Sequence, residues 1–370
     1  MTATKGLEGI VAATSSISSI VDGVLTYRGY NIDDLAVNAS FDEVAYLLWH
    51  GALPNEEQLA ALRSNLEKYA AVPTELIEQM KLYPKDMNMM AALRTAVSGL
   101  ALYDKEADDM SREANLTKAE RLQAQLPTLV AALARISEGQ EPIAPKEGLG
   151  LTENFLYMMS GEVPEQTAIE ALDKALVLHA DHELNASTFA SRVTVATLSD
   201  IYSGVTSAIG ALKGPLHGGA NEAVMRTLEE IGTVDNVESY INDKLANKVK
   251  IMGFGHRVYK NGDPRAKHLM EMSRRLGETK GDTSLYEMSV KVEELVTSKK
   301  GLKPNVDFYS ASVYTMLGIP RKLFTPIFAI SRVSGWTAHI LEQYEDNRLI
   351  RPRAEYVGEL DLTYVPIQQR

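Results

Sequence analysis

The chain has 370 residues, of which 45% are hydrophobic and 24% charged, and its formal net charge is −11. A chain of this length predicts a large buried core divided between two lobes. The absence of cysteine excludes disulfides, thiolate metal ligands and cysteine nucleophiles, and it is typical of a reducing compartment. The negative charge argues against a broad surface for nucleic acid or anionic membranes, so an anionic substrate would need positive charges gathered locally.

The N-terminal segment carries no targeting signal that we can identify. Residues 1–16 lack a basic region followed by a long apolar run, and Glu8 interrupts the segment early. No stretch approaches 18 apolar residues, so we expect no membrane span and a cytoplasmic location. Residues 9–30 alternate loosely between apolar and polar types around Asp22-Gly23, which predicts a short β-hairpin.

Almost everything after residue 30 has the pattern of amphipathic helices, with apolar residues recurring at three and four. Ser40 with Glu43 forms a capping-box pattern, and Gly51 marks the end of that helix. Asn55 with Gln58 repeats the pattern at the next helix. No fixed period of 20 to 50 residues recurs, which argues against a solenoid. We therefore expect a mainly α fold with a small N-terminal β-hairpin element.

Two glycine-proline breaks divide the chain into candidate lobes. They lie at Gly214-Pro215 and at residues 318–320. We expect a large helical domain from 1–215 and 319–370, and a small helical domain from 216–318. Three segments are apolar on most faces, which indicates burial in the core or in a subunit interface: 94–102, 126–136 and 195–212.

The segment GFGHRVYKNGDPR, residues 253–265, contains the densest set of candidate functional residues. It lacks the third glycine of a dinucleotide fingerprint, and no clear strand precedes it. It offers His256 on a flexible loop, then Asp263 as a predicted N-cap and Pro264 at the first helical position. Arg265 would then lie in the first turn, where its guanidinium could bind a carboxylate bidentately. The alternative is a solvated arginine at a capped helix.

Residues 178–185, LHADHELN, place His179 and His182 one helical turn apart. Ala186 stands where a zincin motif has its second histidine, and no carboxylate or thiolate set completes a metal site. We therefore expect no metal. The alternative to a functional role is that one histidine packs and the other forms a structural hydrogen bond.

Two further residues stand at chain breaks. His217 lies in GPLHGGAN, at a loose bend between a proline and two glycines. Asp307 lies among apolar and hydroxyl residues just before a helix. It could cap that helix, and a carboxylate near the helix N-terminus would also stay ionised and could serve as a general base.

Arginines recur near the C-terminus. Arg332 lies in a strongly apolar helical segment, where a buried arginine needs an anionic partner. Arg348, Arg351 and Arg353 follow in NRLIRPRAEY, and any one of them could be solvated. No GxSxG, Walker or EF-hand motif is present, so no motif indicates Ser-His-Asp hydrolysis.

Together these segments resemble the citrate synthases, in order and in approximate spacing over essentially the whole chain. The segments that carry the resemblance are LHADHELNAS, GPLHGGAN, GFGHRVYKNGDPR, NVDFYSAS and FAISRVSGWTAHILEQ. The resemblance implies a helical dimer with the active site in a cleft between a large and a small domain. It implies condensation of acetyl-CoA with oxaloacetate and hydrolysis of citryl-CoA to citrate and CoA, without a metal or a redox cofactor.

The resemblance also implies roles for single residues. Asp307 would remove a proton from the acetyl methyl group, His217 would hydrogen-bond the thioester carbonyl, and His256 would polarise the oxaloacetate ketone. Three residues would hold the oxaloacetate carboxylates: His182, Arg265 and Arg332. These roles agree with elementary chemistry, because a carboxylate removes a thioester α-proton only if donors meet the developing oxyanion.

Three further positions follow from the same resemblance. Arg351 corresponds to an arginine that reaches over from the partner subunit, which predicts at least a homodimer. Lys260 stands where better-known members have an arginine for CoA phosphate. A lysine keeps the positive charge there but lacks the bidentate geometry of a guanidinium. Phe328 would pack near the acetyl group.

Three alternatives stand beside this reading. A 2-methylcitrate synthase would use propionyl-CoA on the same residues. A catalytically silent helical interaction protein would keep only the fold. A metal-dependent hydrolase would be built on the histidines.

Overall fold

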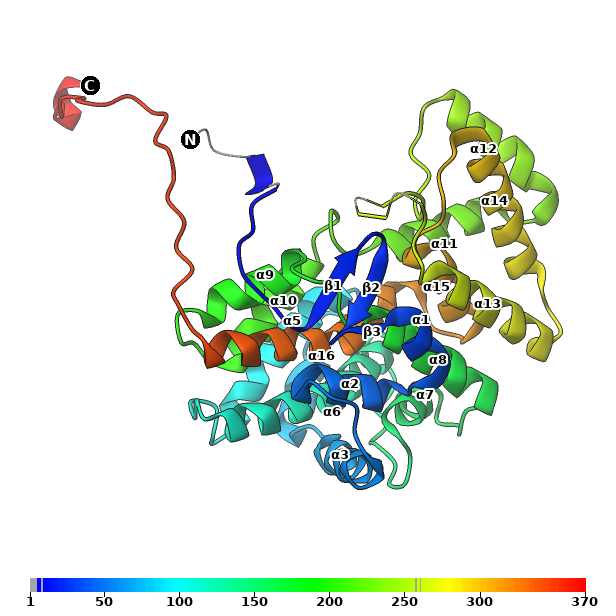
Figure 1. The fold of residues 1–370 in the computed structure, drawn as a ribbon, viewed down its shortest axis with the longest axis horizontal. Coiled ribbons are helices and arrows are strands. Elements are labelled where there is room, and N and C mark those ends of the chain that lie inside the picture. Colours follow the sequence, from blue (N-terminus) through cyan, green and yellow to red (C-terminus); the bar gives the residue numbers. More distant parts are fainter. Residues whose placement is uncertain (1–4, 8, 257, 260) are drawn as a thin grey trace.

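The structure is a computed structural model that describes residues 5–7, 9–256, 258–259 and 261–370. The described residues form sixteen α-helices and one small antiparallel sheet (Figure 1). The mainly α fold with an N-terminal β element is therefore confirmed. The helices are α1 (Ile32–Asn38), α2 (Phe41–His50), α3 (Glu56–Tyr69), α4 (Thr74–Lys81), α5 (Met89–Leu100), α6 (Arg112–Ser137), α7 (Leu151–Ser160), α8 (Gln166–His179), α9 (Ala186–Val195), α10 (Ile201–Leu212), α11 (Ala220–Ile231), α12 (Val237–Ala246), α13 (Ala266–Lys280), α14 (Ser284–Lys300), α15 (Val306–Met316) and α16 (Phe324–Glu345).

The sheet has the strand order β1 (Ser18–Val21), β2 (Val24–Tyr27) and β3 (Tyr30–Asn31). Asp22 and Gly23 form the predicted turn, and both have positive φ, at 51° and 80°. This pair of left-handed residues matches the twist of a two-residue hairpin.

Local signals also fixed the ends of the first helices. Ser40 and Glu43 form both bonds of a capping box, and Asn55 and Gln58 do the same at α3. Gly51 ends α2 in the left-handed conformation, with φ of 81°. These three features are as predicted.

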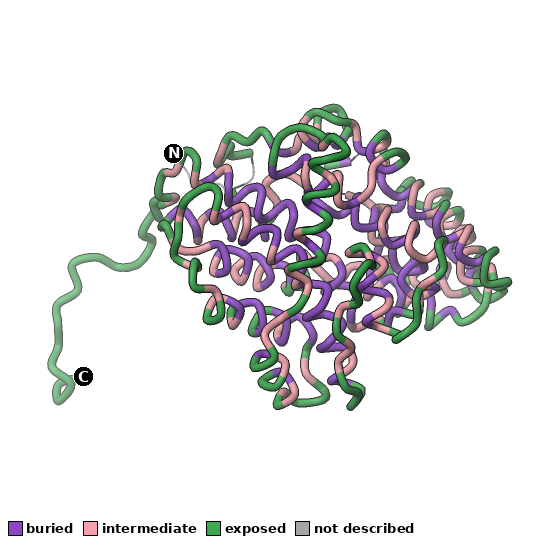
Figure 2. The backbone as a smooth tube through the Cα atoms, turned by 90° about the horizontal axis from the view of Figure 1, so that it is seen from below, coloured by how far each residue is buried: buried purple, intermediate pink, exposed green. Residues whose placement is uncertain are grey.

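The core is organised around α16, which packs against α2, α6, α8, α9 and α10. Most residues of α16 are buried, including Arg332 and His339. Figure 2 shows the buried backbone concentrated in the middle of the molecule, with exposed segments around it. A helix of this kind can carry polar side chains only where they find partners inside the protein.

Helices α11 to α15 gather on one side of the molecule, where α13 and α15 pack against α8 (Figure 1). These five helices lie within residues 216–318, the segment expected to form the small domain. The division into two domains stays a prediction.

After α16 the chain leaves the body of the protein (Figure 1), and residues 351–370 are all exposed. None of the described helices is both long and apolar enough to cross a bilayer.

Candidate active site

A cavity of about 640 Å³ gathers most of the candidate residues. Its lining includes seven residues that were predicted from the sequence: His182, His217, His256, Arg265, Asp307, Phe328 and Arg332. They come from segments far apart in the chain: the loop after α8, the bend before α11, the loop before α13, the start of α15 and the middle of α16. The fold therefore brings together residues that the sequence shows only as separate motifs.

His217 is held as a neutral hydrogen-bond donor. Its Nε2 lies 2.7 Å from Ser187 Oγ and 3.3 Å from the backbone N–H of Ser187. Because that N–H can only donate, Nε2 accepts and the ring proton sits on Nδ1. Trp336 Nε1 donates to Ser187 Oγ at 3.0 Å, and the one proton of that hydroxyl has two acceptors within reach, His217 Nε2 and Asn185 Oδ1 at 2.8 Å. Burial, followed by the charge of Arg332, lowers the pKa of His217 to about 4.

His256 is neutral with the opposite tautomer. Its Nδ1 accepts from the backbone N–H groups of Val258 and Tyr259, at 3.1 and 3.3 Å. The ring proton therefore lies on Nε2. Burial and then the Arg265 charge lower the pKa of His256, so the ring stays an uncharged donor at neutral pH.

His182 lies beside His256, with 5.3 Å between the ring centroids, and its Nε2 is 3.0 Å from the hydroxyl of Tyr259. Burial and then Arg265 hold the pKa of His182 well below its usual value. The sequence alternative for LHADHELN is partly correct, because the neighbouring His179 is fully buried and bonded to the Ala175 carbonyl at 2.7 Å.

The N-terminal hairpin holds the loop that carries His182. Ser18 Oγ donates to Asp181 and accepts from the backbone N–H of Glu183 at 2.9 Å. The Glu183 side chain accepts from Ile20 N at 2.6 Å, and Glu183 itself has a positive φ of 50°. A non-glycine residue in this conformation is costly, and the hairpin supplies the bonds that keep it there.

Arg265 forms a bidentate ion pair with Asp263, with Nε–Oδ1 at 2.9 Å and Nη2–Oδ2 at 2.8 Å. The prediction that Asp263 is the N-cap and Pro264 the first helical residue is wrong, because α13 begins at Ala266 with Arg265 in the N-cap position. No side chain caps α13, but Asp263 Oδ1 accepts from the backbone N–H of Arg265 at 3.1 Å and Oδ2 accepts from the backbone N–H of Val306 at 3.0 Å. The sequence does not show these contacts of the Asp263 carboxylate, because they depend on the burial of the Arg265 guanidinium and on the position of α15. Nη1 of Arg265 makes only a long contact, 3.5 Å, to the Leu178 carbonyl.

Arg332 donates from Nε to the His179 carbonyl at 2.7 Å, and its guanidinium lies 4.6 Å from the ring centre of Phe328. Burial lowers its pKa to about 10, so it remains charged at neutral pH. Among the described residues, no carboxylate forms an ion pair with Arg332. Its terminal nitrogens can therefore bind an anion in the cavity.

Asp307 is the second residue of α15, and Asn305 rather than Asp307 caps that helix. Burial raises the pKa of Asp307 to about 6, although Arg265 and Arg332 oppose the shift. The expected effect of the helix N-terminus is thus outweighed by burial. The carboxylate remains mostly ionised at neutral pH and is a stronger base than a solvated aspartate.

Two predicted residues remain. Arg351 is on the exposed C-terminal segment and does not line the cavity. Lys260 lies outside the described residues. In the described part of the chain, no group of three or more His, Cys, Asp or Glu side chains is arranged to hold a metal ion.

Sequence reasoning missed the residues that orient the histidines. Ser187 and Trp336 fix His217, and Tyr259 contacts both His182 and His256. All three lie in the quoted motifs. Their hydroxyl and indole groups could have indicated this role, because such groups need a hydrogen-bond partner when they are buried.

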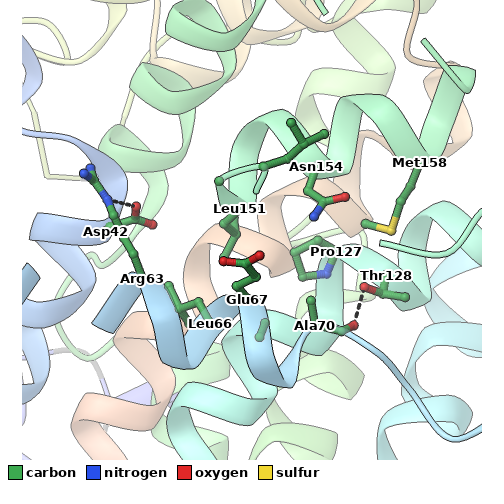
Figure 3. A pocket seen from close by; sticks show the side chains of 13 residues that line it. Asp42, Arg63, Leu66, Glu67, Ala70, Pro127, Thr128, Leu151, Asn154 and Met158 are labelled. Atoms are coloured by element: carbon green, nitrogen blue, oxygen red, sulfur yellow. Dashed lines mark hydrogen bonds and ion pairs between the residues drawn. The ribbon is translucent and has the colours of Figure 1, made fainter. Parts of the chain in front are cut away.

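A second, small cavity lies between α3, α6 and α7 (Figure 3). Its volume is about 30 Å³, and it contains none of the candidate residues. Pro127, inside α6, lines it together with Leu66 and Met158. We interpret it as a packing gap beside the proline, with room for no more than about one or two waters.

One cavity of this almost wholly helical protein holds a basic carboxylate, neutral histidines and buried arginines. This combination of titratable and charged groups is typical of an enzyme active site. The sequence model described as "Citrate synthase, C-terminal domain" matches residues 6–353. The chain therefore belongs to the citrate synthase family, and it is an enzyme of the acyltransferase class.

Individual relatives agree with this assignment. The chain is 64% identical to "Citrate synthase 2" of Bacillus subtilis over 100% of both chains. It is 45% identical to a "2-methylcitrate synthase" of Mycobacterium tuberculosis, covering 96% of this chain and 90% of that protein.

Solved structures show the same fold. The citrate synthase of Pyrobaculum aerophilum superposes with a TM-score of 0.93 at 42% identity, covering 99% of this chain and 95% of that one. The Thermoplasma acidophilum citrate synthase, in a ternary complex with carboxymethyl coenzyme A and oxaloacetate, gives a TM-score of 0.92 at 36% identity over 99% of each chain.

Proposed function

We propose that this protein condenses acetyl-CoA with oxaloacetate and water to give citrate and CoA. The observation that carries the proposal is the meeting of His217, His256 and Asp307 with two buried arginines in one cavity. The high identity to citrate synthases over the full chain supports it.

Each catalytic residue has a state that suits its role. Asp307, as the base, takes a proton from the acetyl methyl group. Nδ1–H of His217 donates to the thioester oxygen as negative charge develops there. Nε2–H of His256 donates to the oxaloacetate ketone, which makes its carbon more electrophilic. Both histidines act as neutral donors, which agrees with their lowered pKa values.

Oxaloacetate carries two carboxylates, and the cavity offers two arginines and a histidine for them. No described residue hydrogen-bonds the terminal nitrogens of Arg332, Nη1 of Arg265 makes only a 3.5 Å contact, and His182 adds a neutral ring. Arginine matches carboxylate geometry, so these residues also orient the ketone toward His256.

The acyl-CoA phosphates need a basic surface on an acidic protein. A pocket of about 270 Å³ next to the His256 loop has an apolar floor that includes Phe254, with lysines 248, 250 and 300 around it. We propose that CoA binds across this pocket with Lys260 contributing to its phosphate contacts. Changing Lys250 and Lys300 to alanine should raise the KM for acetyl-CoA, and added salt should lessen the difference.

We further propose a homodimer without metal or redox cofactor, acting in the cytoplasm. The exposed position of Arg351 supports a role across a subunit interface, because its segment runs away from the body of its own chain.

The test is release of CoA thiol from acetyl-CoA in the presence and absence of oxaloacetate. We expect release that depends on oxaloacetate, yields citrate, survives exhaustive chelation and is lost in Asp307→Ala. Release without oxaloacetate, loss on chelation, or full activity of Asp307→Ala would refute the proposal.

A second candidate is 2-methylcitrate synthase, which the 45% identical relative of that name favours. The substrates differ by one methylene, which is worth only about 1–3 kcal/mol of discrimination. Comparing kcat/KM for acetyl-CoA and propionyl-CoA decides between them, and a clear preference for propionyl-CoA would select the second.

A further inference from the structure

Next to the loop that carries His182 lies a mostly buried network of polar side chains that the proposed mechanism does not use. It consists of Asp181, His339, Arg192 and Glu342. Asp181 and His339 are 0% and 1% exposed, and Arg192 is 4% exposed. Such a chain is costly to bury unless its members satisfy one another.

The contacts show which group donates and which accepts at each hydrogen bond of this network. Arg192 Nη1 lies 2.7 Å from Glu342 Oε2 and 3.0 Å from His339 Nδ1. Because arginine can only donate, His339 Nδ1 accepts and its ring proton lies on Nε2. Nε2 then donates to Asp181 Oδ2 at 3.3 Å. His339 is therefore a neutral bridge with a fixed tautomer between a charged arginine and a buried carboxylate.

Asp181 touches the site in two ways. It directly precedes His182, and its backbone N–H and carbonyl both bond the Tyr27 hydroxyl, at 3.3 and 3.1 Å. Its charge also opposes the fall in the pKa of Arg332 that burial causes. A Cβ at Gly335 would stand 2.5 Å from Asp181 Oδ1. A glycine at this position of α16 therefore makes space for the Asp181 carboxylate.

Both ends of the chain are tied to one short N-terminal segment. Ser16 donates from its backbone N–H to Glu342 at 2.8 Å, and Ser18 donates from Oγ to Asp181. Through these two contacts, the N-terminal segment connects both ends of this network of polar side chains next to the loop that carries His182.

We propose that His339 is a positioning residue for the substrate's carboxylates, which it serves by fixing Asp181 beneath His182 and beside Arg332. This inference rests on the proposed function, since it concerns how the same site holds a dicarboxylate before the acyl-CoA reacts. His339 does not line the cavity and contacts no substrate.

The test compares His339→Leu with His339→Gln. Leucine fills space but makes neither bond, whereas the glutamine amide can accept from Arg192 and donate to Asp181. We expect His339→Leu to weaken oxaloacetate binding about tenfold or more, with kcat at saturating substrates changed far less, because a buried carboxylate loses its donor. His339→Gln should restore most of the affinity. Ile340→Ala, a buried change on the same helix away from the chain, should lower the Tm without changing oxaloacetate affinity.

Direct calorimetric titration with oxaloacetate, without acyl-CoA, separates this inference from the proposed function. If the wild-type protein does not bind oxaloacetate, both fail. If the wild type binds it and His339→Leu binds it equally well, only the inference fails. Should His339→Leu not fold, Ser18→Ala reports on the same carboxylate from the other side, and unchanged affinity there would overturn the inference.

Discussion

At the scale of single residues, Ser187 decides which nitrogen of His217 carries the proton. Its backbone N–H donates to Nε2 at 3.3 Å, and its hydroxyl oxygen lies 2.7 Å from the same nitrogen, so Nδ1–H is left as the donor. Without the hydroxyl, the ring can change tautomer or turn, and the developing oxyanion loses its donor.

We therefore predict that Ser187→Ala lowers kcat about 10- to 100-fold, as expected for a lost hydrogen bond of about 1–3 kcal/mol. Nitrogen NMR of the His217 ring should show a changed tautomer in the variant. The matched control is Ser191→Ala, on the same helix, whose hydroxyl bonds the Thr188 carbonyl at 2.7 Å. An equal loss of kcat in both variants would mean that α9 is merely distorted.

The ionisation of Asp307 should set the pH dependence of catalysis. Burial raises its pKa to about 6, and a base must be ionised to act. We predict that kcat/KM for acetyl-CoA falls about tenfold per pH unit below about pH 6. A profile that stays flat down to pH 4.5 would contradict the assignment of Asp307 as the base.

The same shift has a consequence for stability. The folded-state pKa of about 6 lies above the ordinary value of 3.8, so the folded protein binds this proton more tightly. The ionised carboxylate destabilises the fold above pH 6, and the penalty disappears below about pH 4. Asp307→Asn should therefore have a higher Tm than the wild type at pH 7.5 and a similar Tm at pH 4. A lower Tm at pH 7.5 would show that the buried carboxylate is better accommodated than we infer.

At the scale of elements, two loop segments pair to bring His256 and Asp307 together. Gly255 N–H bonds the Lys303 carbonyl at 2.9 Å, and Asn305 N–H bonds the Gly253 carbonyl at 2.9 Å. Asn305 also caps α15, and its amide donates to the Gly255 carbonyl at 3.0 Å. One side chain thus fixes both the start of the helix that carries Asp307 and the loop that carries His256.

We predict that Asn305→Ala lowers stability by about 1 kcal/mol, as for other lost N-caps, and lowers kcat by more than tenfold. Asn55→Ala removes an N-cap from α3, which is remote from the cavity, and should cost similar stability without loss of kcat. Denaturant unfolding and steady-state kinetics on the two variants provide the comparison. If both variants keep wild-type kcat, the pairing of the loops does not position the catalytic groups.

At the scale of the whole molecule, the sequence was most informative where a structure depends on near neighbours. The Asp22-Gly23 turn and the Ser40 cap involve residues within a few positions, and both were predicted correctly. Asp263 was assigned only to the start of the next helix, because its bond to the backbone N–H of Val306, 43 positions away, is not visible in the sequence. The chain through His339 was missed for the same reason, since it joins residues about 150 positions apart.

The position of the C-terminal segment bears on whether Arg351 serves the active site of a partner subunit. Arg351 is exposed, on the C-terminal segment that leaves the body of its own chain (Figure 1). If it serves an active site, that site belongs to another copy of the chain. Mixed dimers of two inactive variants then regain one intact site, because Arg351 and the catalytic residues come from different subunits.

We predict that Arg351→Ala and His256→Ala, each inactive alone, regain activity when unfolded together, mixed equally and refolded. Half of the dimers are then hybrids with one complete site each, so the mixture should reach about a quarter of wild-type activity. Mixing His256→Ala with Asp307→Ala is the control, because both residues lie in the same cavity and no hybrid restores a site. Activity in the control alone, or in neither mixture, would place Arg351 outside the partner's site.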